Sequence, residues 1–418
     1  AGYDLTSGNA NVLVGGFAGT NLTTGQDNVA IGTSALDVDL DGNNSVAIGR
    51  NALGSQTGTD ADMHNTAVGF EAGKGSTIGK FNTFIGSVSG GLGVTTGDHN
   101  VGVGVETLYA LTSGTSNVAI GYQAGSKLTS GSYNVAIGRE ALETEDGHGS
   151  NVAIGYRSLR LLNKGGDGYN VALGTEAAQI MTTGDACVAL GAFALDNNKT
   201  GNNIVAVGYG ALGTHQVSGA GGNVTAVGTL AASKLTTGTT GTFIGMSSGN
   251  HATTCTSTTF VGHNAGFGVS GQGLTGAFNT ALGHEAGLKL STTGHENTFL
   301  GSYAGYYNGS SSTANGITTG ANNTAIGYAA YPTSATVSNE FTLGNADVSS
   351  LRCAVQTIST LSDERDKTNI VDVPLGLDFI NTLRPVSFDW NARDGSRVGR
   401  KDFGFIAQEL KTAQDATS

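Results

Sequence analysis

Alternating acidic residues near the N-terminus have the spacing of a calcium-binding loop. Asp37, Asp39 and Asp41 precede Gly42 at the positions where such a loop places its first carboxylates and its turn glycine. The twelfth position of the loop requires a bidentate glutamate, and here it is Ile48. We therefore expect a solvated acidic turn at this place.

Two glycine-containing motifs resemble catalytic or cofactor-binding patterns. Residues 245–249 (Gly-Met-Ser-Ser-Gly) fit the turn that presents a nucleophilic serine, and residues 266–271 fit the dinucleotide fingerprint. Gly245 belongs to a repeat described below, and the second motif lacks a strand-to-helix context. A chain with 68 glycines produces such matches by chance, so we expect no cofactor.

Histidines and tyrosines supply the remaining binding chemistry. The eight histidines lie mainly in or beside turns, among them His148, His215, His251, His263 and His295. Paired across a symmetry axis they would offer metal ligands, but solvated loop histidines are commoner, and we expect no metal.

A set of tyrosines recurs at similar places in the repeat, most of them directly after its glycine: Tyr122, Tyr156, Tyr209, Tyr303 and Tyr328. They either form an aromatic stripe that stacks on sugars or pack against neighbouring coils, and packing is favoured.

Composition limits the elements that position these residues. The 68 glycines exclude a helical bundle, because glycine destabilises helix interiors, and only 3 prolines with no three-residue period exclude collagen. A net charge of -12 offers no basic stripe for nucleic acid, and no apolar run is long enough for membrane insertion. The three cysteines, Cys187, Cys255 and Cys353, form no disulfide framework, and the first residues predict no signal peptide.

A short phrase, Asn-Val-Ala-Ile-Gly, recurs throughout the chain. Full copies begin at Asn28, Asn117, Asn134 and Asn151, and looser ones bring the total to nineteen, mostly 17 residues apart. A fixed short period predicts a parallel β-solenoid (β-roll) over residues 1–351, roughly 90 Å long at the strand spacing.

Alternation along each strand predicts two different faces. In Val-Ala-Ile the two branched residues share one side and alanine takes the other. We expect the branched residues to fill the coil interior and a second short strand to follow at pairs such as Ala141-Leu142. The small alanine face would then allow close approach of another subunit, and a thin coil with open edges favours a parallel homotrimer.

Asparagine opens twelve of the nineteen copies. It serves either as a left-handed turn residue or as a ladder of side chains along the axis, and the turn role is favoured. Cys187 replaces it once and is expected to be a packed residue and not a reactive thiol. The repeat resembles the head repeat of YadA-type trimeric autotransporter adhesins, whose period is shorter.

Composition changes after Leu351. Residues 352–418 contain 4 of the 68 glycines and the only tryptophan, Trp390. Residues 375–383 and 404–413 have helical patterns, and residues 386–390 alternate like a strand. We expect a small α+β domain here.

Three blocks of this domain follow one another in order: Ser-Asp-Glu-Arg-Asp-Lys-Thr-Asn-Ile at 362–370, Leu-Arg-Pro-Val-Ser-Phe-Asp-Trp at 383–390 and Phe-Gly-Phe-Ile-Ala-Gln-Glu-Leu at 403–410. Together they resemble the peptidase S74 family, the intramolecular chaperones of phage tailspikes and endosialidases. The family continues into further helices, so the domain is expected to be truncated here.

The resemblance implies a trimeric folding clamp that removes itself with a Ser/Lys dyad. Ser362 is then the nucleophile, Lys367 the general base, and Ser362–Asp363 the bond that is cut. A lysine partly buried by trimer packing has a lowered pKa and accepts the serine proton. A serine attacking its own carbonyl would form a four-membered ring, so the attacking group comes from a neighbouring chain or is water. On local residues alone, Ser362-Asp363 also fits a simple helix cap.

These features together predict a structural, receptor-binding viral tail fibre or spike, located in the virion. Its expected partners are two further copies of itself, other tail proteins, and a host cell-surface glycan or protein; autoproteolysis is the only enzymatic activity expected. The alternatives are a bacterial trimeric surface adhesin, a glycan-degrading tailspike, which needs a carboxylate pair, and a self-assembling extracellular filament.

Overall fold

The computed structural model describes residues 1–58, 62–91, 93–147, 149–163, 165–216, 222–290, 293–306, 317–352, 377–389 and 401–415. The chain divides into two compact units, Ala1–Asn345 and Ala346–Ser418.

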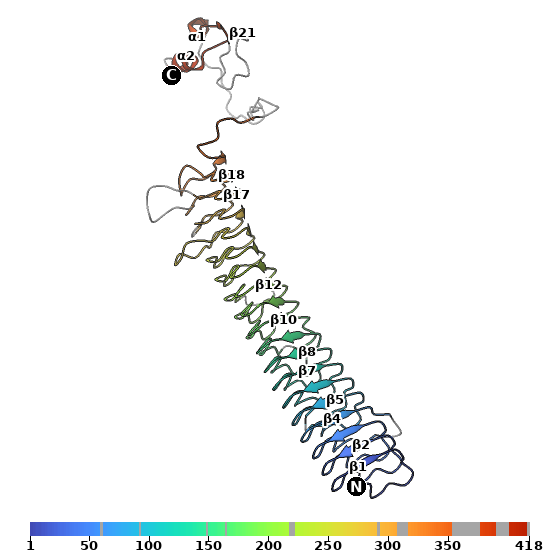
Figure 1. The fold of residues 1–418 in the computed structure, drawn as a ribbon. Helices are drawn as coiled ribbons and strands as arrows, with labels where there is room; N and C mark the ends of the chain where they lie inside the picture. The colour runs from blue at the N-terminus through green and yellow to red at the C-terminus, as the bar shows by residue number, and fades with distance from the viewer. Residues whose placement is uncertain are drawn as a thin grey trace. The chain divides into compact units, whose positions relative to one another are not determined.

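One parallel sheet runs through the whole first unit. Each coil adds one three-residue strand, and the strands stack in chain order (Figure 1). Their bounds are β1 Val12–Val14, β2 Val29–Ile31, β3 Val46–Ile48, β4 Thr66–Val68, β5 Thr83–Ile85, β6 Val101–Val103, β7 Val118–Ile120, β8 Val135–Ile137, β9 Val152–Ile154, β10 Val171–Leu173, β11 Val188–Leu190, β12 Val205–Val207, β13 Thr225–Val227, β14 Thr242–Ile244, β15 Thr259–Val261, β16 Thr280–Leu282, β17 Thr298–Leu300, β18 Thr324–Ile326 and β19 Phe341–Leu343.

The register is the same at every step. In β7 and β8, Val118 pairs with Val135, Ala119 with Ala136 and Ile120 with Ile137, so identical positions form ladders. The predicted parallel β-solenoid of nineteen coils is thereby confirmed.

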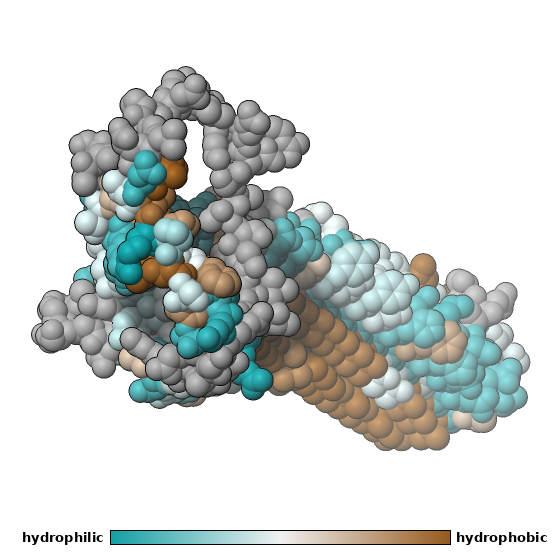
Figure 2. All heavy atoms as spheres, turned by 90° about the horizontal axis from the view of Figure 1, so that it is seen from above, coloured by the Kyte–Doolittle hydropathy of each residue, from teal (hydrophilic) through white to brown (hydrophobic). Residues whose placement is uncertain are grey.

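The predicted direction of the strand side chains is wrong. Ala119 and Ala136 are buried, whereas Ile120 is 38% exposed, so alanine faces the interior and the branched residues face outward. The reason is the thinness of the coil. Leucines of the following turn, such as Leu142 and Leu159, fill the interior and leave the strand room for only a methyl group. Figure 2 shows the resulting hydrophobic band along the solenoid.

In some coils the inward strand residue is large and the turn residue that packs beside it is small, the reverse of alanine with leucine. Where phenylalanine replaces the inward alanine, the fourth residue after the repeat glycine is glycine and not leucine. A Cβ on Gly266 would lie 2.2 Å from the ring of Phe260. The four pairs are Phe84 with Gly90, Phe243 with Gly249, Phe260 with Gly266, and Phe299 with Gly305.

Left-handed residues bend each coil. In the eighth coil, Tyr133 before the asparagine has φ 62°, and Glu140 and Leu142 after the strand have φ 56° and 51°. The predicted second strand at Ala141-Leu142 is therefore a turn, because alternate left-handed residues prevent an extended run. The repeat glycine is required for close approach: a Cβ on Gly138 (φ 129°) would lie 2.5 Å from the carbonyl oxygen of Gly155.

The recurring asparagines form a buried ladder, and the favoured turn role is wrong. Asn117 Oδ1 accepts the backbone N–H of Asn134 at 2.9 Å, and Asn117 Nδ2 donates to Asn100 Oδ1 at 3.0 Å and to the Gly131 carbonyl at 2.9 Å. The positive φ belongs to the residue before each asparagine, so the amide is free to bond along the axis. Each coil thereby satisfies polar groups of its neighbour.

The second unit combines short helices and a hairpin. Helix α1 spans Leu377–Thr382, strands β20 (Val386–Asp389) and β21 (Lys401–Gly404) pair antiparallel, and helix α2 spans Ala407–Asp415. The helix predicted from 404 begins later because Gly404 is the last residue of β21. Among the described helices, none has the length and apolar character needed to cross a bilayer.

Candidate functional site

The predicted dyad lies in a segment that the structure does not describe. Ser362, Asp363 and Lys367 fall within 353–376, outside the described residues, so their geometry is left as predicted from the sequence.

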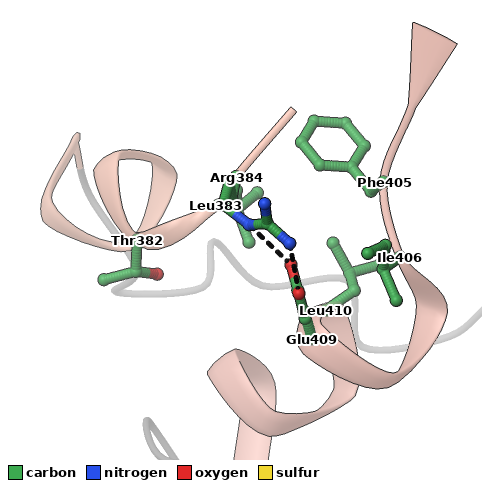
Figure 3. A pocket seen from close by; sticks show the side chains of 7 residues that line it. All are labelled: Thr382, Leu383, Arg384, Phe405, Ile406, Glu409 and Leu410. Carbon is green, nitrogen blue, oxygen red and sulfur yellow. Dashed lines mark hydrogen bonds and ion pairs between the residues drawn. The ribbon is translucent and has the colours of Figure 1, made fainter. Parts of the chain in front are cut away.

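An ion pair joins the second and third sequence blocks of the C-terminal unit. Arg384 Nε donates to Glu409 Oε2 at 3.1 Å and Arg384 Nη2 donates to Glu409 Oε1 at 2.5 Å (Figure 3). The hydrogen bonds from Arg384 lower the pKa of Glu409 below its usual value. A bidentate arginine fixes the direction of the carboxylate, so the pair sets the start of α2 against the loop after α1.

A small hollow surrounds this ion pair. Its lining combines the two charged groups with apolar side chains: Thr382, Leu383, Arg384, Phe405, Ile406, Glu409 and Leu410 (Figure 3). Phe403 is 83% exposed and Phe405 52%, and none of the described residues from 346 onward is buried. The described part of this unit therefore presents apolar side chains that a single copy leaves uncovered.

The five predicted tyrosines fall into separate clusters on the solenoid. Tyr122 and Tyr156 flank Arg139, whose guanidinium lies 5.6 Å and 6.0 Å from their ring centres. Arg157 lies 4.8 Å over the Tyr156 ring, and Glu140 accepts from Arg139 and Arg157 at 2.9 and 2.7 Å. Cation–π contacts between neighbouring coils therefore hold these two tyrosine rings in place.

The other three tyrosines make edge contacts. Tyr209 meets Phe193 with ring centres 5.7 Å apart, and Tyr303 meets Tyr328 at 5.9 Å. Tyr303 stands two places after its repeat glycine, whereas Tyr328 follows its glycine directly. Tyr209 and Tyr328 remain 54% and 65% exposed, so both keep ring surface for a ligand.

The acidic turn near the N-terminus is not solvated at its central residue. Asp39 is fully buried and accepts N–H groups from Gly42 at 3.0 Å, from Gly58 at 3.1 Å and from Gln56 Nε2 at 2.5 Å. Burial raises the pKa of Asp39. The carboxylate ties one coil to the next, because its acceptor capacity is used by backbone and amide donors.

Cys187 occupies the asparagine position as a packed residue, as predicted. It is buried, its N–H donates to Asn170 Oδ1 at 3.0 Å, and its thiol donates to the Gly201 carbonyl at 3.2 Å. Burial raises the pKa of the thiol to about 11, which keeps it protonated and unreactive.

The serine motif at residues 245–249 belongs to the solenoid. Ser247 lies in the left-handed turn with φ 55°, and the buried Ser248 hydroxyl donates to the Phe260 carbonyl at 2.9 Å. Gly249 is the glycine paired with Phe243 in the core. Each residue of the motif thus has a structural role in the coil.

One cluster of possible metal ligands was not predicted from the sequence. His263 and His284 both follow a repeat glycine directly, on adjacent coils, and Glu285 is next in the chain. Their ligand atoms lie within 4.8 Å of one another. Placing each coil's residues by their distance from the repeat glycine would have revealed the pair.

Comparison with known proteins identifies the C-terminal region alone. Residues 362–417 match the model of the peptidase S74 family, described as chaperone of endosialidase. No curated protein and no solved structure matches the chain. The matched segment begins at the predicted nucleophile and includes the Arg384–Glu409 pair. The chain therefore carries, behind a parallel β-solenoid, a chaperone-of-endosialidase domain of the peptidase S74 family.

Proposed function

We propose that this chain is the elongated part of a phage tail fibre or tailspike, a homotrimer whose folding is assisted by its C-terminal domain. The observation that carries the proposal is the chaperone-of-endosialidase match at 362–417, directly after a solenoid of nineteen strands. A chaperone domain at the end of a long fibre aligns chain ends before slow parallel strand pairing begins.

The outward face of the sheet supports a trimer. Every strand presents its first and third residues outward, and those positions hold only Val, Thr, Ile, Leu or, once, Phe. The third residue is aliphatic in all 19 strands, and Leu173 and Leu282 are 49% and 45% exposed. Monomers seldom expose apolar patches larger than a few hundred Å².

The outward-facing first and third strand residues form a band without charge. This favours another copy of the same chain as the partner that packs against it. The residues of the band lie in register parallel to the solenoid axis, so a second copy in parallel presents the same spacing of side chains. Thus the expected alanine interface is replaced by an interface of valine, isoleucine and leucine.

The domain's second role is its own removal. In this proposal Ser362 acts as nucleophile and Lys367 as general base; both lie within the segment that matches the family model. Water adds across the Ser362–Asp363 bond, which leaves a carboxyl group on Ser362 and an amino group on Asp363. The attacking atom is the Ser362 hydroxyl of a neighbouring chain, which displaces the Asp363 amine to form an ester that water then hydrolyses.

The test of assembly and cleavage compares the wild-type chain with Ser362→Ala and Lys367→Ala. Intact mass should show wild type ending at Ser362, with residues 363–418 released, and both variants uncut at 418 residues. Light scattering should show three chains per particle in all samples. An uncut wild type would overturn self-removal, and a monomeric wild type would overturn the chaperone-assisted trimer.

A second test addresses the interface. Ile137→Lys places a charge on the apolar band, so three lysines would meet in the trimer and the particle should dissociate. Tyr133→Lys is the matched control, because Tyr133 lies in the same coil, 67% exposed, but outside the strand. Equal masses for both variants would contradict the proposed interface.

Receptor binding is assigned to the exposed rings. The Tyr122–Arg139–Tyr156 stack and the Tyr303–Tyr328 pair present aromatic surface on the flank of the fibre, where a glycan can stack. Binding of host-cell glycans to the wild-type trimer, compared with Tyr122→Ala and Tyr328→Ala, tests this role; unchanged binding in both would exclude these rings.

A further inference from the structure

Two histidines stack on adjacent coils near the C-terminal end of the solenoid. His263 follows Gly262 after β15, and His284 follows Gly283 after β16. Their ring centres lie 5.1 Å apart with 14° between the ring planes. The stack follows from the register, since equal positions of neighbouring coils lie one strand spacing apart.

A carboxylate completes the group. Glu285 Oε1 lies 3.8 Å from His284 Nε2, and the side chain of Glu285 is 20% exposed while that of His284 is 47% exposed. One ligand atom from each of the three residues falls within 4.8 Å of the others. Solvent reaches the group through His284, so an ion can enter.

A ring nitrogen of His263 provides a second, independent observation. His263 Nδ1 is buried and has no hydrogen-bond partner within the described part of the chain. A buried polar atom without a partner destabilises the folded state. A cation that lies in the plane of the His263 ring, on the lone pair of this nitrogen, would satisfy it.

The donor set has the chemistry of a transition-metal site. Two imidazoles and one carboxylate are the ligands that zinc takes in open three-ligand sites, with bond lengths of about 2.0–2.2 Å. The donors must approach by about 1–2 Å from their present separation to meet one ion. The His284 side chain, 47% exposed and in edge contact with Tyr303 at 5.3 Å between ring centres, is the one that must turn toward the other two ligands.

We propose that His263, His284 and Glu285 bind one divalent transition-metal ion of the zinc type, which clamps β15 to β16. The coil between these strands is longer than the standard one, since Gly283 stands 21 residues after Gly262. An ion that bridges the two coils stabilises the folded solenoid by linkage, since the site forms only when the coils are stacked.

Three of the remaining described histidines, His64, His99 and His215, provide contrasts. His64 and His99 are separated by the Phe81 ring, with ring centres 5.1 and 4.9 Å from it, so this stack places phenyl carbon between the imidazoles. His215 is buried with Asn198 at 2.9 Å and the Gly238 carbonyl at 3.1 Å on its two nitrogens. Stacking or burial of a histidine is therefore not enough by itself to form a site like the proposed one, which needs several ligand atoms close together.

The test is calorimetric titration of ZnCl2 into the full chain, produced without a histidine tag. Wild type should bind one ion per chain, and His284→Ala and Glu285→Gln should each weaken binding by at least about tenfold. His64→Ala is the matched control and should bind like wild type. CaCl2 should give no binding, because imidazole is a poor calcium ligand.

A thermal scan separates the clamp from folding defects. Zn²⁺ should raise the midpoint of unfolding of wild type and His64→Ala but not of His284→Ala, while all three have the same circular dichroism before heating. Absence of saturable Zn²⁺ binding by wild type would overturn the proposal. Unchanged affinity in Glu285→Gln and His284→Ala would overturn it as well, and Glu285→Gln preserves side-chain size, so folding does not obscure the result.

Discussion

The solenoid and the C-terminal unit differ in where their apolar side chains go. In the solenoid most coils bury an alanine, a leucine or both between the coils before and after them, as the coil of Ala136 and Leu142 does. In the C-terminal unit, none of the described residues is buried, and Phe403 is 83% exposed. One region completes its core from its own neighbours along the chain, and the described part of the other leaves apolar surface open.

This difference separates two sources of stability. A repeat unit gains its contacts from adjacent repeats, so the stability of a solenoid is approximately a sum over neighbouring coils. A small unit of about seventy residues has little core of its own and depends on association or on further chain. Covering the apolar side chains of the C-terminal unit is therefore expected to need other copies, which fits the proposed trimeric chaperone.

The largest expected effect comes from the solenoid core. Gly266→Leu should destabilise its coil by more than about 3 kcal/mol, because the side chain would enter the space of Phe260. Adding Phe260→Ala should restore most of the loss, since the pair then equals Ala136 with Leu142, a leucine that also has positive φ. Urea unfolding followed by circular dichroism measures both; no rescue in the double variant would contradict the size exchange.

The next effect comes from the asparagine ladder. Asn117→Val should cost about 2–4 kcal/mol, because it leaves the Asn134 N–H and the Gly131 carbonyl without their buried partner. Thr112→Val is the control, since the hydrogen bond that it removes, from the Thr112 hydroxyl to the Thr129 carbonyl, is exposed, and it should change the urea midpoint little. Equal losses in the two variants would show that burial is not what makes the ladder strong.

A smaller effect depends on pH. Burial, and secondarily the charge of Glu176, raise the pKa of Asp196 to about 6. The folded state then holds this proton more tightly than the unfolded chain, so the group favours folding below pH 4 and loses this contribution as pH rises through about 6. Because Asp196 is partly exposed, Asp196→Asn should stabilise the chain by only about 1 kcal/mol at pH 7.

The measurement for Asp196 is the thermal midpoint at two pH values. The variant should melt above wild type at pH 7, and the difference should disappear at about pH 3, where the wild-type carboxyl is protonated in both states. A difference of the same size at both pH values would mean that charge is not its cause.

The smallest effect on the solenoid is expected from the C-terminal unit. Phe403→Ser should leave the solenoid's urea midpoint within about 0.5 kcal/mol of wild type, because an exposed side chain contributes little to a single copy. It should nevertheless lower the yield of trimer on refolding, as measured by light scattering. A large loss of solenoid stability would show that the two units are energetically coupled, and an unchanged trimer yield would exclude Phe403 from assembly.

The sequence alone determined the period, the parallel stack and its nineteen coils, because each coil repeats the same strand and the same glycine. It also identified the family of the C-terminal region from three ordered blocks.

Only the tertiary structure decided which face of Val-Ala-Ile is inside. Alternation defines two faces of a strand but does not say which of them points to the interior. The interior is filled by the leucine of the next turn, and this leaves room only for the small face of the strand. The same holds for the asparagine amides and for His263 with His284, whose neighbours are fixed by the stacking of coils. These contacts join residues a full coil apart, so they exist only once the register is formed.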